Sequence, residues 1–445
     1  MGAASTQLHG VCYNPTWTTW VPGASNTGPD AQLSDSDFFN DSFVALWDQG
    51  TDSNNNVYRN DLGTIAGGGF NLLRLYNWGP TRGWNGTVGT AHIGFLNRAV
   101  ALGIRVIIPI SNYFLSDDVY AWNGALPDAA YSFQSAPSAI QSALTQFLGS
   151  VTDPSTKRLH TAVHSFSVGN EIDINTLQGQ GTSGIVEPSV RLARILWWIV
   201  NLQRLLSGGL GTALLTSPIS NADQGNPGVS PRSYWFQAFV NGVTGGVTNL
   251  PQGTTGGTGT TFQKSFSGLG QYSWGSTWYY NSVNIYQYGA GLQATLAQYD
   301  RWTAQSQNNL NWPGQQFQSP LMLTEIGVAR GQPSNSSNQE SQFTTVTRDI
   351  ALAIESYVKA NASKLIGYNI YEFGDEVYIG NNFGMVMVEP TTYPSGNVLY
   401  TEATGPTVVS YATWPSINYP VDQQFNVTNT QNTSLLAALA SIFRS

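Results

Sequence analysis

Charged side chains are scarce in this sequence. Only 10% of its 445 residues are Asp, Glu, Lys or Arg, and only four are lysines, whereas charged residues typically make up about a quarter of a protein. The net charge of -8 provides no excess of cations to neutralise phosphates, which argues against a nucleic-acid partner. The polar surface is therefore built mostly from Asn, Gln, Ser, Thr and Gly, as suits an extracellular protein that handles neutral ligands.

Cysteine and long apolar runs are also nearly missing. Cys12 is alone, so no internal disulfide and no Cys-based zinc site can form, and we interpret it as a small buried hydrophobe. No run of about 18 apolar residues occurs, so we expect no membrane span. The first ten residues, MGAASTQLHG, show no signal-peptide pattern. We expect a secreted or cell-surface monomer whose signal peptide is not present in this chain.

The sequence is 41% hydrophobic and 12% aromatic, and it contains a series of short apolar or β-branched runs. Such runs predict buried strands. We expect eight of them, at residues 8–14, 70–77, 104–110, 164–171, 212–220, 281–288, 319–326 and 365–373.

Amphipathic stretches lie between several of these runs, and their apolar residues recur at helical spacing. The clearest are 90–103, 138–151, 190–207 and 344–360. Alternating strands and helices predict a parallel sheet covered by helices, and eight repeats predict an α/β fold closed into a (β/α)8 TIM barrel. A doubly wound open sheet is the alternative, but no Gly-rich phosphate loop follows the first strand.

The barrel is expected to form one catalytic domain over residues 1–445, with elaborated loops. A Gly/Thr-rich loop insertion is expected around 242–280, since predicted strands lie on both sides of it. The C-terminal segment 380–445 is expected to pack on the barrel.

Two glutamates stand at the ends of predicted strands, in a chain that has only nine. Glu171 ends the run SFSVGNE and Glu325 ends PLMLTE. Barrel enzymes carry their chemistry at the carboxyl ends of the strands, so strands 4 and 7 would bring these carboxylates together across the barrel mouth. Glycoside hydrolysis needs such a pair, one as the proton donor and one to attack the anomeric carbon.

Several motifs together resemble a known family. VGNEID with LTEIG resembles the large (β/α)8 clan of retaining glycoside hydrolases. GVCYNP, LLRLYN, NIYQY and IYEFGDEVYIGNNFGMV resemble, in order, motifs of endo-β-1,3-glucanases and β-1,3-glucanosyltransferases, over roughly residues 8 to 390. The chain departs from the glucanases where IGVARG replaces a Gly-Trp-Pro run, and from the disulfide-bonded transferases in having one Cys.

The resemblance implies that Glu171 is the acid/base and Glu325 the nucleophile of a double displacement through a covalent glycosyl-enzyme, with β-1,3-glucan as the expected substrate. Asn170 would bind the sugar 2-hydroxyl, while Arg74 and Tyr286 would support Glu325. Further substrate contacts are expected from strand ends and loop aromatics, namely Tyr13, Tyr76, Asn112, Tyr371, Glu372, Trp78 and Trp278.

Other functions remain open from the sequence alone. A β-1,4-glucanase or mannanase of the same clan would use the same glutamates, and a non-catalytic carbohydrate-binding barrel would normally have lost one of them. Whether water or a second sugar accepts the glycosyl group depends on acceptor subsites. We expect no cofactor and no catalytic metal, although the Asp/Asn-rich stretches 34–41 and 48–56 leave a structural calcium open.

Overall fold

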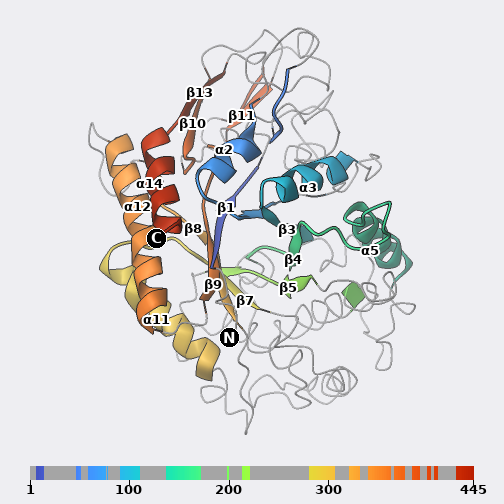
Figure 1. Ribbon diagram of the computed structural model, residues 1–445, viewed down its shortest axis with the longest axis horizontal. Coiled ribbons are helices and arrows are strands. Elements are labelled where there is room, and N and C mark those ends of the chain that lie inside the picture. The colour runs from blue at the N-terminus through green and yellow to red at the C-terminus, as the bar shows by residue number, and fades with distance from the viewer. Residues whose placement is uncertain are drawn as a thin grey trace.

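The chain winds through a curved parallel sheet with helices packed outside it (Figure 1). The computed structural model describes residues 7–14, 47–51, 59–76, 78, 91–110, 137–171, 198–199, 213–220, 280–305, 320–330, 339–361, 365–375, 383–390, 398–401, 405–408 and 427–445. The insertion expected around 242–280, except Tyr280, and the Asp/Asn-rich stretch 34–41 lie outside these residues.

Among the described residues, the sheet contains nine strand segments in the order β5-β4-β3-β2-β1-β9-β8-β7-β6, and every pairing between neighbours is parallel. Their apolar and β-branched residues are almost all buried, as expected for a sheet covered on its outer face. The bounds are β1 Leu8–Cys12, β2 Leu72–Arg74, β3 Arg105–Ile110, β4 Val163–Val168, β5 Leu214–Thr216, β6 Ile219–Ser220, β7 Asn281–Ile285, β8 Leu321–Ile326 and β9 Leu365–Ile370.

The first and last segments of this order, β5 and β6, belong to one predicted strand. Only Ser217 and Pro218 separate them, and proline has no N–H to donate to a sheet ladder. β5 pairs with β4, and β6 pairs with β7. The Tyr280 N–H also donates to the Leu215 carbonyl across this seam at 3.1 Å. The nine segments therefore make the eight strands of a (β/α)8 barrel, which confirms the expected fold.

Helices cover the outside of the sheet, with α11, α12 and α14 along one side in Figure 1. The stretches predicted at 90–103, 138–151 and 344–360 are helical, and of 190–207 the structure describes only the helical residues 198–199. None of the described helices is long and apolar enough to cross a membrane. The helices are α2 Asp61–Gly67, α3 Ala91–Ala101, α5 Ser138–Ser150, α11 Ala290–Gln305, α12 Gln339–Asn361 and α14 Thr433–Phe443.

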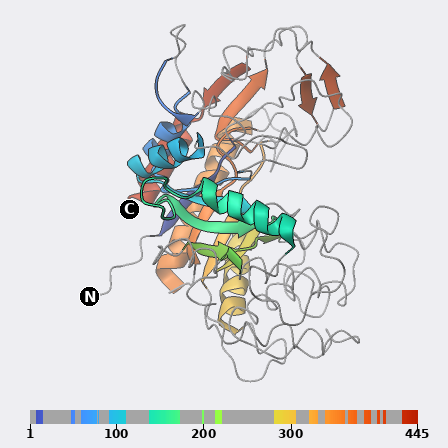
Figure 2. The ribbon, with the colours of Figure 1, turned by 90° about the vertical axis from the view of Figure 1, so that its right-hand side faces the viewer.

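After β9 the chain forms two antiparallel strand pairs and a last helix. β10 (Val386–Pro390) pairs with β13 (Val427–Gln431), and β11 (Val398–Thr401) pairs with β12 (Gly405–Val408); both pairs lie above the barrel sheet in Figure 2. The side chain of Asn432 caps α14 by accepting from the Leu435 N–H at 2.9 Å. The ring of Phe443 stacks on His9 of β1 at 4.3 Å, so α14 is packed onto the barrel.

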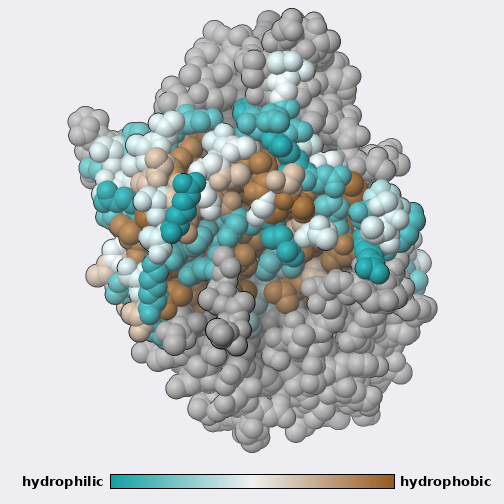
Figure 3. All heavy atoms as spheres, in the orientation of Figure 1, coloured by the Kyte–Doolittle hydropathy of each residue, from teal (hydrophilic) through white to brown (hydrophobic). Residues whose placement is uncertain are grey.

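Alternation along the strands decides which side chains enter the barrel. Leu72, Ile107, Tyr280 and Met322 are fully buried and form a small cluster of their own, separate from the larger core between sheet and helices. Because strand side chains alternate, residues two and four positions after Leu72 face the same interior. On the outside, apolar residues appear among polar ones across the middle of the face shown in Figure 3.

Burial of His164 on β4 predicts a loss of stability in acid. Burial, reinforced by the positive charge of Arg105, lowers the pKa of His164 from 6.5 to about 4. Between pH 6.5 and 4 the unfolded chain therefore binds a proton that the folded chain does not, so stability falls as pH falls through this window. The loss approaches about 3 kcal/mol, at roughly 1.4 kcal/mol per pKa unit.

Urea unfolding of the wild type and of His164→Gln at pH 7 and at pH 4.5 measures this effect. The variant should lose less stability between the two pH values than the wild type does. Equal losses in both proteins would show that His164 does not carry the pH dependence.

Candidate active site

Polar side chains from four barrel strands meet at the carboxyl end of the sheet. Their positions follow from alternation, because Arg74 and Tyr76 come two and four residues after Leu72, and Asn284 comes four residues after Tyr280. The structure joins six of the twelve predicted site residues in one hydrogen-bonded network, namely Arg74, Tyr76, Asn170, Glu171, Tyr286 and Glu325, together with Asn284.

Glu325 on β8 is buried at 4% exposure and receives three hydrogen bonds through its side chain. Arg74 Nη1 donates to Oε1 at 2.5 Å, and the Tyr76 hydroxyl donates to the same oxygen at 2.8 Å. The Tyr286 hydroxyl donates to Oε2. Hydrogen bonds from a cation and from hydroxyls to a carboxylate are strong, so these donors stabilise negative charge on Glu325 and fix the plane of its carboxyl group.

Arg74 connects Glu325 to the rest of the site. Its side chain is almost fully buried, and its Nη2 donates to Asn170 Oδ1 at 2.7 Å. Burial alone would lower the pKa of Arg74, but the neighbouring acidic groups of Tyr76 and Glu325 raise it above its ordinary value. Arg74 therefore stays charged, and its planar guanidinium holds two strand ends at fixed angles.

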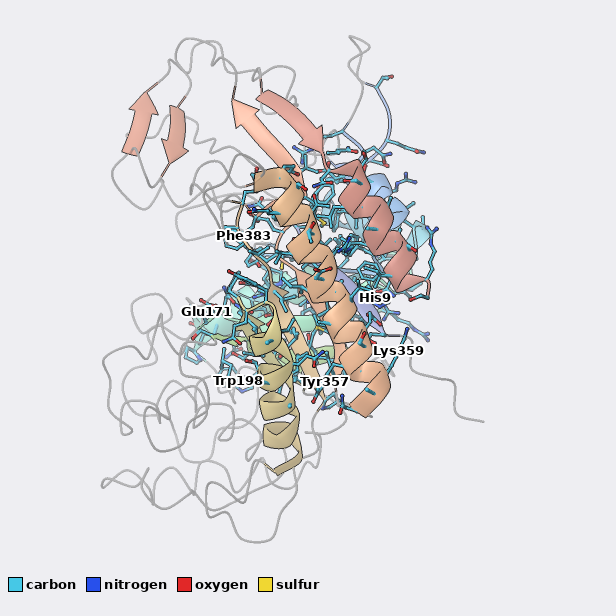
Figure 4. All side chains as sticks on the ribbon, turned by 90° about the vertical axis from the view of Figure 1, so that its left-hand side faces the viewer. His9, Glu171, Trp198, Tyr357, Lys359 and Phe383 are labelled. Carbon is cyan, nitrogen blue, oxygen red and sulfur yellow. The ribbon has the colours of Figure 1, made fainter. Side chains whose placement is uncertain are left out.

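Glu171 follows β4 in an unusual backbone conformation. Its φ of 47° lies in the left-handed region, which non-glycine residues adopt rarely and at a cost of roughly 1–3 kcal/mol. Its N–H donates to the Pro218 carbonyl at 3.0 Å. The strand end is thus anchored while the carboxylate turns towards Asn284, whose Nδ2 donates to Glu171 Oε1 at 2.9 Å. Figure 4 labels Glu171 at this end of the barrel.

Asn284 links Glu171 to Arg74, the partner of Glu325, and was not predicted from the sequence. Its Nδ2 contacts Glu171, while its Oδ1 accepts from Arg74 Nη1 at 3.3 Å and from Thr324 Oγ1 at 2.8 Å. A single amide therefore separates Glu171 from the ion pair of Arg74 with Glu325. The available signal was its place two residues before Tyr286 in NIYQY, which puts both side chains on the inner face of β7.

The two tyrosines that donate to Glu325 remain protonated. Burial, together with the negative charge of Glu325, raises the pKa of Tyr286 well above 10. Burial also raises the pKa of Tyr76, with Cys12 and Glu325 adding to the effect. Both hydroxyls consequently keep the proton that they donate to the carboxylate.

Aromatic rings surround this carboxylate on one side. The ring centroid of Tyr371, just after β9, lies 6.2 Å from Tyr76 and 5.8 Å from Tyr286, in edge-to-face contact with both. Phe383 lies 5.6 Å from Tyr286 and 5.3 Å from Tyr371. Although the hydroxyl of Tyr286 is enclosed against Glu325, the residue is 41% exposed as a whole, so its ring presents an apolar face beside Glu325.

Two predicted substrate contacts lie in the core, and a third is buried. Tyr13 is fully buried and its hydroxyl donates to Asp61 at 2.9 Å, while Trp78 is 2% exposed and its Nε1 donates to Ser150 Oγ at 2.9 Å. Glu372 is 1% exposed. Tyr13 and Trp78 are enclosed by the core between sheet and helices, so we leave them out of the site.

Two further predicted contacts, Asn112 and Trp278, lie outside the described residues. Among the residues that the structure describes, no group of three His, Cys, Asp or Glu side chains could hold a metal ion.

No protein family model matches the chain, and no curated protein matches it. Among solved structures it is similar to the β-glucosidase from Thermotoga maritima in complex with deoxynojirimycin, with a TM-score of 0.50 and 11% identity over 87% of this chain and 94% of that chain. The same β-glucosidase in complex with galacto-hydroximolactam gives a TM-score of 0.51, at the same identity and coverage. At this identity the likeness shows the fold, a barrel shared with a glycosidase.

Arg74→Met should strongly destabilise the protein. The change keeps an apolar chain of similar length but leaves Glu325 buried without its cation, which typically costs about 3–5 kcal/mol. Urea unfolding measures the loss, and Arg74→Met/Glu325→Gln should recover part of it because the unpaired charge is gone. Arg348→Ala breaks an exposed ion pair with Asp349 and should change the midpoint little. An Arg74→Met midpoint equal to that of Arg348→Ala would contradict the cost of leaving the Glu325 charge buried and unpaired.

Proposed function

We propose that this protein is a retaining glycoside hydrolase or transglycosylase that acts on β-glucan. The observation that carries the proposal is the pair of carboxylates at the barrel mouth: Glu325 is held by Arg74 and two tyrosines, and Glu171 is linked to the same Arg74 through Asn284. A barrel that places two carboxylates at this end can supply both an acid and a nucleophile to one glycosidic bond.

Each side chain has a distinct role in the proposed double displacement. Glu325 attacks the anomeric carbon, the bond to the leaving oxygen breaks, and Glu171 gives its proton to that oxygen. Glu171 then accepts a proton from water or from a sugar hydroxyl, which attacks the same carbon and releases Glu325. For this retaining mechanism we expect the two carboxyl groups to lie about 5 to 5.5 Å apart. That separation leaves no room for the water molecule that an inverting mechanism needs.

Asn170 is proposed to bind the sugar beside the reacting carbon. Its Oδ1 accepts from both Arg74 Nη2 at 2.7 Å and Asn284 Nδ2 at 3.1 Å, so the orientation of the amide is fixed. The nitrogen end is then the one that would donate to the sugar 2-hydroxyl, a bond that strengthens as the transition state forms.

The substrate class is proposed from two sources. The strand-end motifs resemble those of β-1,3-glucanases and β-1,3-glucanosyltransferases, and the structurally similar proteins are β-glucosidases, one of them in complex with cyclophellitol. A chain with few charged residues and many Asn and aromatic residues suits an uncharged glucan, and we propose that the enzyme acts outside the cell as a monomer. β-1,4-Glucan and mannan are the competing polymers.

Glu325→Gln should abolish turnover of aryl β-glucosides and glucans while leaving the fold intact, because the amide cannot form the glycosyl-enzyme. Glu171→Ala should still release a burst of a good leaving group such as dinitrophenol, which needs little protonation, and then stall. Added azide should restart Glu171→Ala by giving the β-glycosyl azide. Unaltered activity of Glu325→Gln, or an α-linked azide product, would remove the assignment.

Incubation of one laminari-oligosaccharide of defined length should give products that identify the acceptor. Products longer than the substrate are expected if a second sugar reaches the glycosyl-enzyme before water, and only shorter ones if water does. Laminarin should be cleaved in preference to cellulose and mannan. Cleavage of cellulose or mannan in preference to laminarin would replace the proposed polymer and keep the carboxylate pair.

A further inference from the structure

The short segment before β10 is bonded to the end of β9. The Glu372 N–H donates to the Phe383 carbonyl at 3.1 Å, and the Met385 N–H donates back to the Glu372 carbonyl at 3.0 Å. Further along, the Val386 N–H donates to the Phe373 carbonyl at 2.7 Å. Phe383 is therefore carried by backbone that runs beside the strand end at the mouth of the barrel.

A buried ion pair fixes this segment from its other side. Arg330 Nη1 donates to both carboxylate oxygens of Asp375, at 2.7 and 2.6 Å, and Asp375 is 3% exposed. Asp375 Oδ1 accepts from the Gly384 N–H at 2.7 Å, while Arg330 Nη2 donates to the Gly384 carbonyl. The two charged side chains thus bind both polar groups of the residue that follows Phe383.

Gly384 permits this close approach. A Cβ at this position would lie 2.2 Å from the Asp375 nitrogen, closer than any real side chain can come. Arg330 is itself supported by Phe343, whose ring centroid lies 4.9 Å below the guanidinium, and by Glu340 at 2.7 Å. Arg330 and Asp375 therefore form a rigid clamp, which we call the Arg330–Asp375 clamp.

The clamp ends at the ring of Phe383, which touches Tyr286. Phe383 meets Tyr286 at an interplanar angle of 68° and Tyr371 at 70°. Edge-to-face contacts of this kind restrict the angle of both rings. Figure 4 shows Phe383 and Glu171 on one side of α12 and His9 on the other, so Phe383 lies on the same side of the barrel as the proposed acid/base.

We propose that the Arg330–Asp375 clamp is a positioning device for the nucleophile. By holding Phe383, it holds the ring of Tyr286 and keeps the Tyr286 hydroxyl on Oε2 of Glu325. Oε1 has two other donors, Arg74 and Tyr76, whereas Tyr286 is the donor that the structure shows on Oε2. The catalytic consequence rests on the proposed function of Glu325.

The clamp gives Asp375 and Phe383 a structural role around the proposed nucleophile. The Asp375 carboxylate binds Arg330 and Gly384, within the protein. Phe383 acts through Tyr286, so it is a positioning residue rather than a catalytic one.

A double-mutant cycle tests whether Phe383 acts through the hydroxyl of Tyr286. Phe383→Ala should lower kcat on an aryl β-glucoside or a laminari-oligosaccharide by about three- to tenfold with little change in KM, the scale of one aromatic contact. Phe383→Tyr, which keeps a ring, should retain most of the wild-type kcat. In a Tyr286→Phe protein, which has no hydroxyl to orient, Phe383→Ala should have almost no further effect.

The matched control is Phe443→Ala, which removes a partly buried ring that packs on His9 and not on the site; kcat should stay unchanged. Independent, multiplicative effects of Phe383→Ala and Tyr286→Phe would overturn the inference. So would an effect of Phe383→Ala on KM alone, since that would mean direct contact with substrate.

A second measurement needs no enzymatic turnover. With 3-fluorotyrosine at position 286, the ¹⁹F signal should shift in Glu325→Gln, which changes the acceptor of its hydroxyl. Phe383→Ala and Asp375→Asn should shift or broaden the same signal, whereas Asp349→Asn, which removes an exposed carboxylate, should not.

An unchanged ¹⁹F signal in Phe383→Ala would overturn the inference even if Asp375→Asn failed to fold. A changed signal in a protein that turns over no glycoside would support the positioning role and at the same time reject the proposed function. The two ideas can thus fail separately.

Discussion

The buried ion pair between Arg74 and Glu325 is the constraint on which the rest of the site depends. A carboxylate at 4% exposure is costly unless a cation and hydrogen-bond donors replace its water. Arg74 supplies the cation, and its remaining hydrogen bonds go to Asn170, Asn284 and the Thr324 carbonyl. One planar group therefore fixes side chains from β4, β7 and β8 relative to β2. A lysine in its place would supply charge without that geometry.

The barrel could be predicted because its strands are apolar and its covering helices amphipathic. The sequence did not predict helices that lack a clear apolar stripe. α11, AGLQATLAQYDRWTAQ, is too polar to show a clear apolar stripe, and α2 is a seven-residue helix rich in glycine. The predicted strand 212–220 is divided by Pro218, which interrupts the ladder, although the chain still closes the barrel there.

Part of the site could be predicted because the carboxyl ends of barrel strands meet at one mouth. The sequence did not show whether the side chain of each strand-end residue faces the barrel interior or the surrounding helices. Tyr13 alternates with Cys12 and shares the outward face of Val11, which packs in the core between sheet and helices, so its ring is enclosed there. Asn284 was missed because it lies within a strand rather than at its end. Its inward direction follows only once Tyr286, two residues later, is known to face inward.

Although charged residues are scarce in this chain, several of them form buried ion pairs. In a chain with 18 Lys and Arg, three of the described arginines form nearly enclosed pairs with carboxylates: Arg74 with Glu325, Arg59 with Asp61, and Arg330 with Asp375. Buried pairs of this kind add little net stability, because desolvation offsets their attraction, but breaking one is costly. These buried pairs instead restrict the neighbouring side chains to one arrangement.

Two of these three pairs converge on the same carboxylate. Arg74 reaches Glu325 directly, and Arg330 reaches it through Asp375, Gly384, Phe383 and Tyr286. An uncharged, adaptable polar surface can bind sugars with many weak contacts, but attack on a single carbon requires one oxygen in one orientation. In the proposed mechanism, the two ion pairs thus place fixed charge around the reacting carboxylate, whose orientation decides the rate.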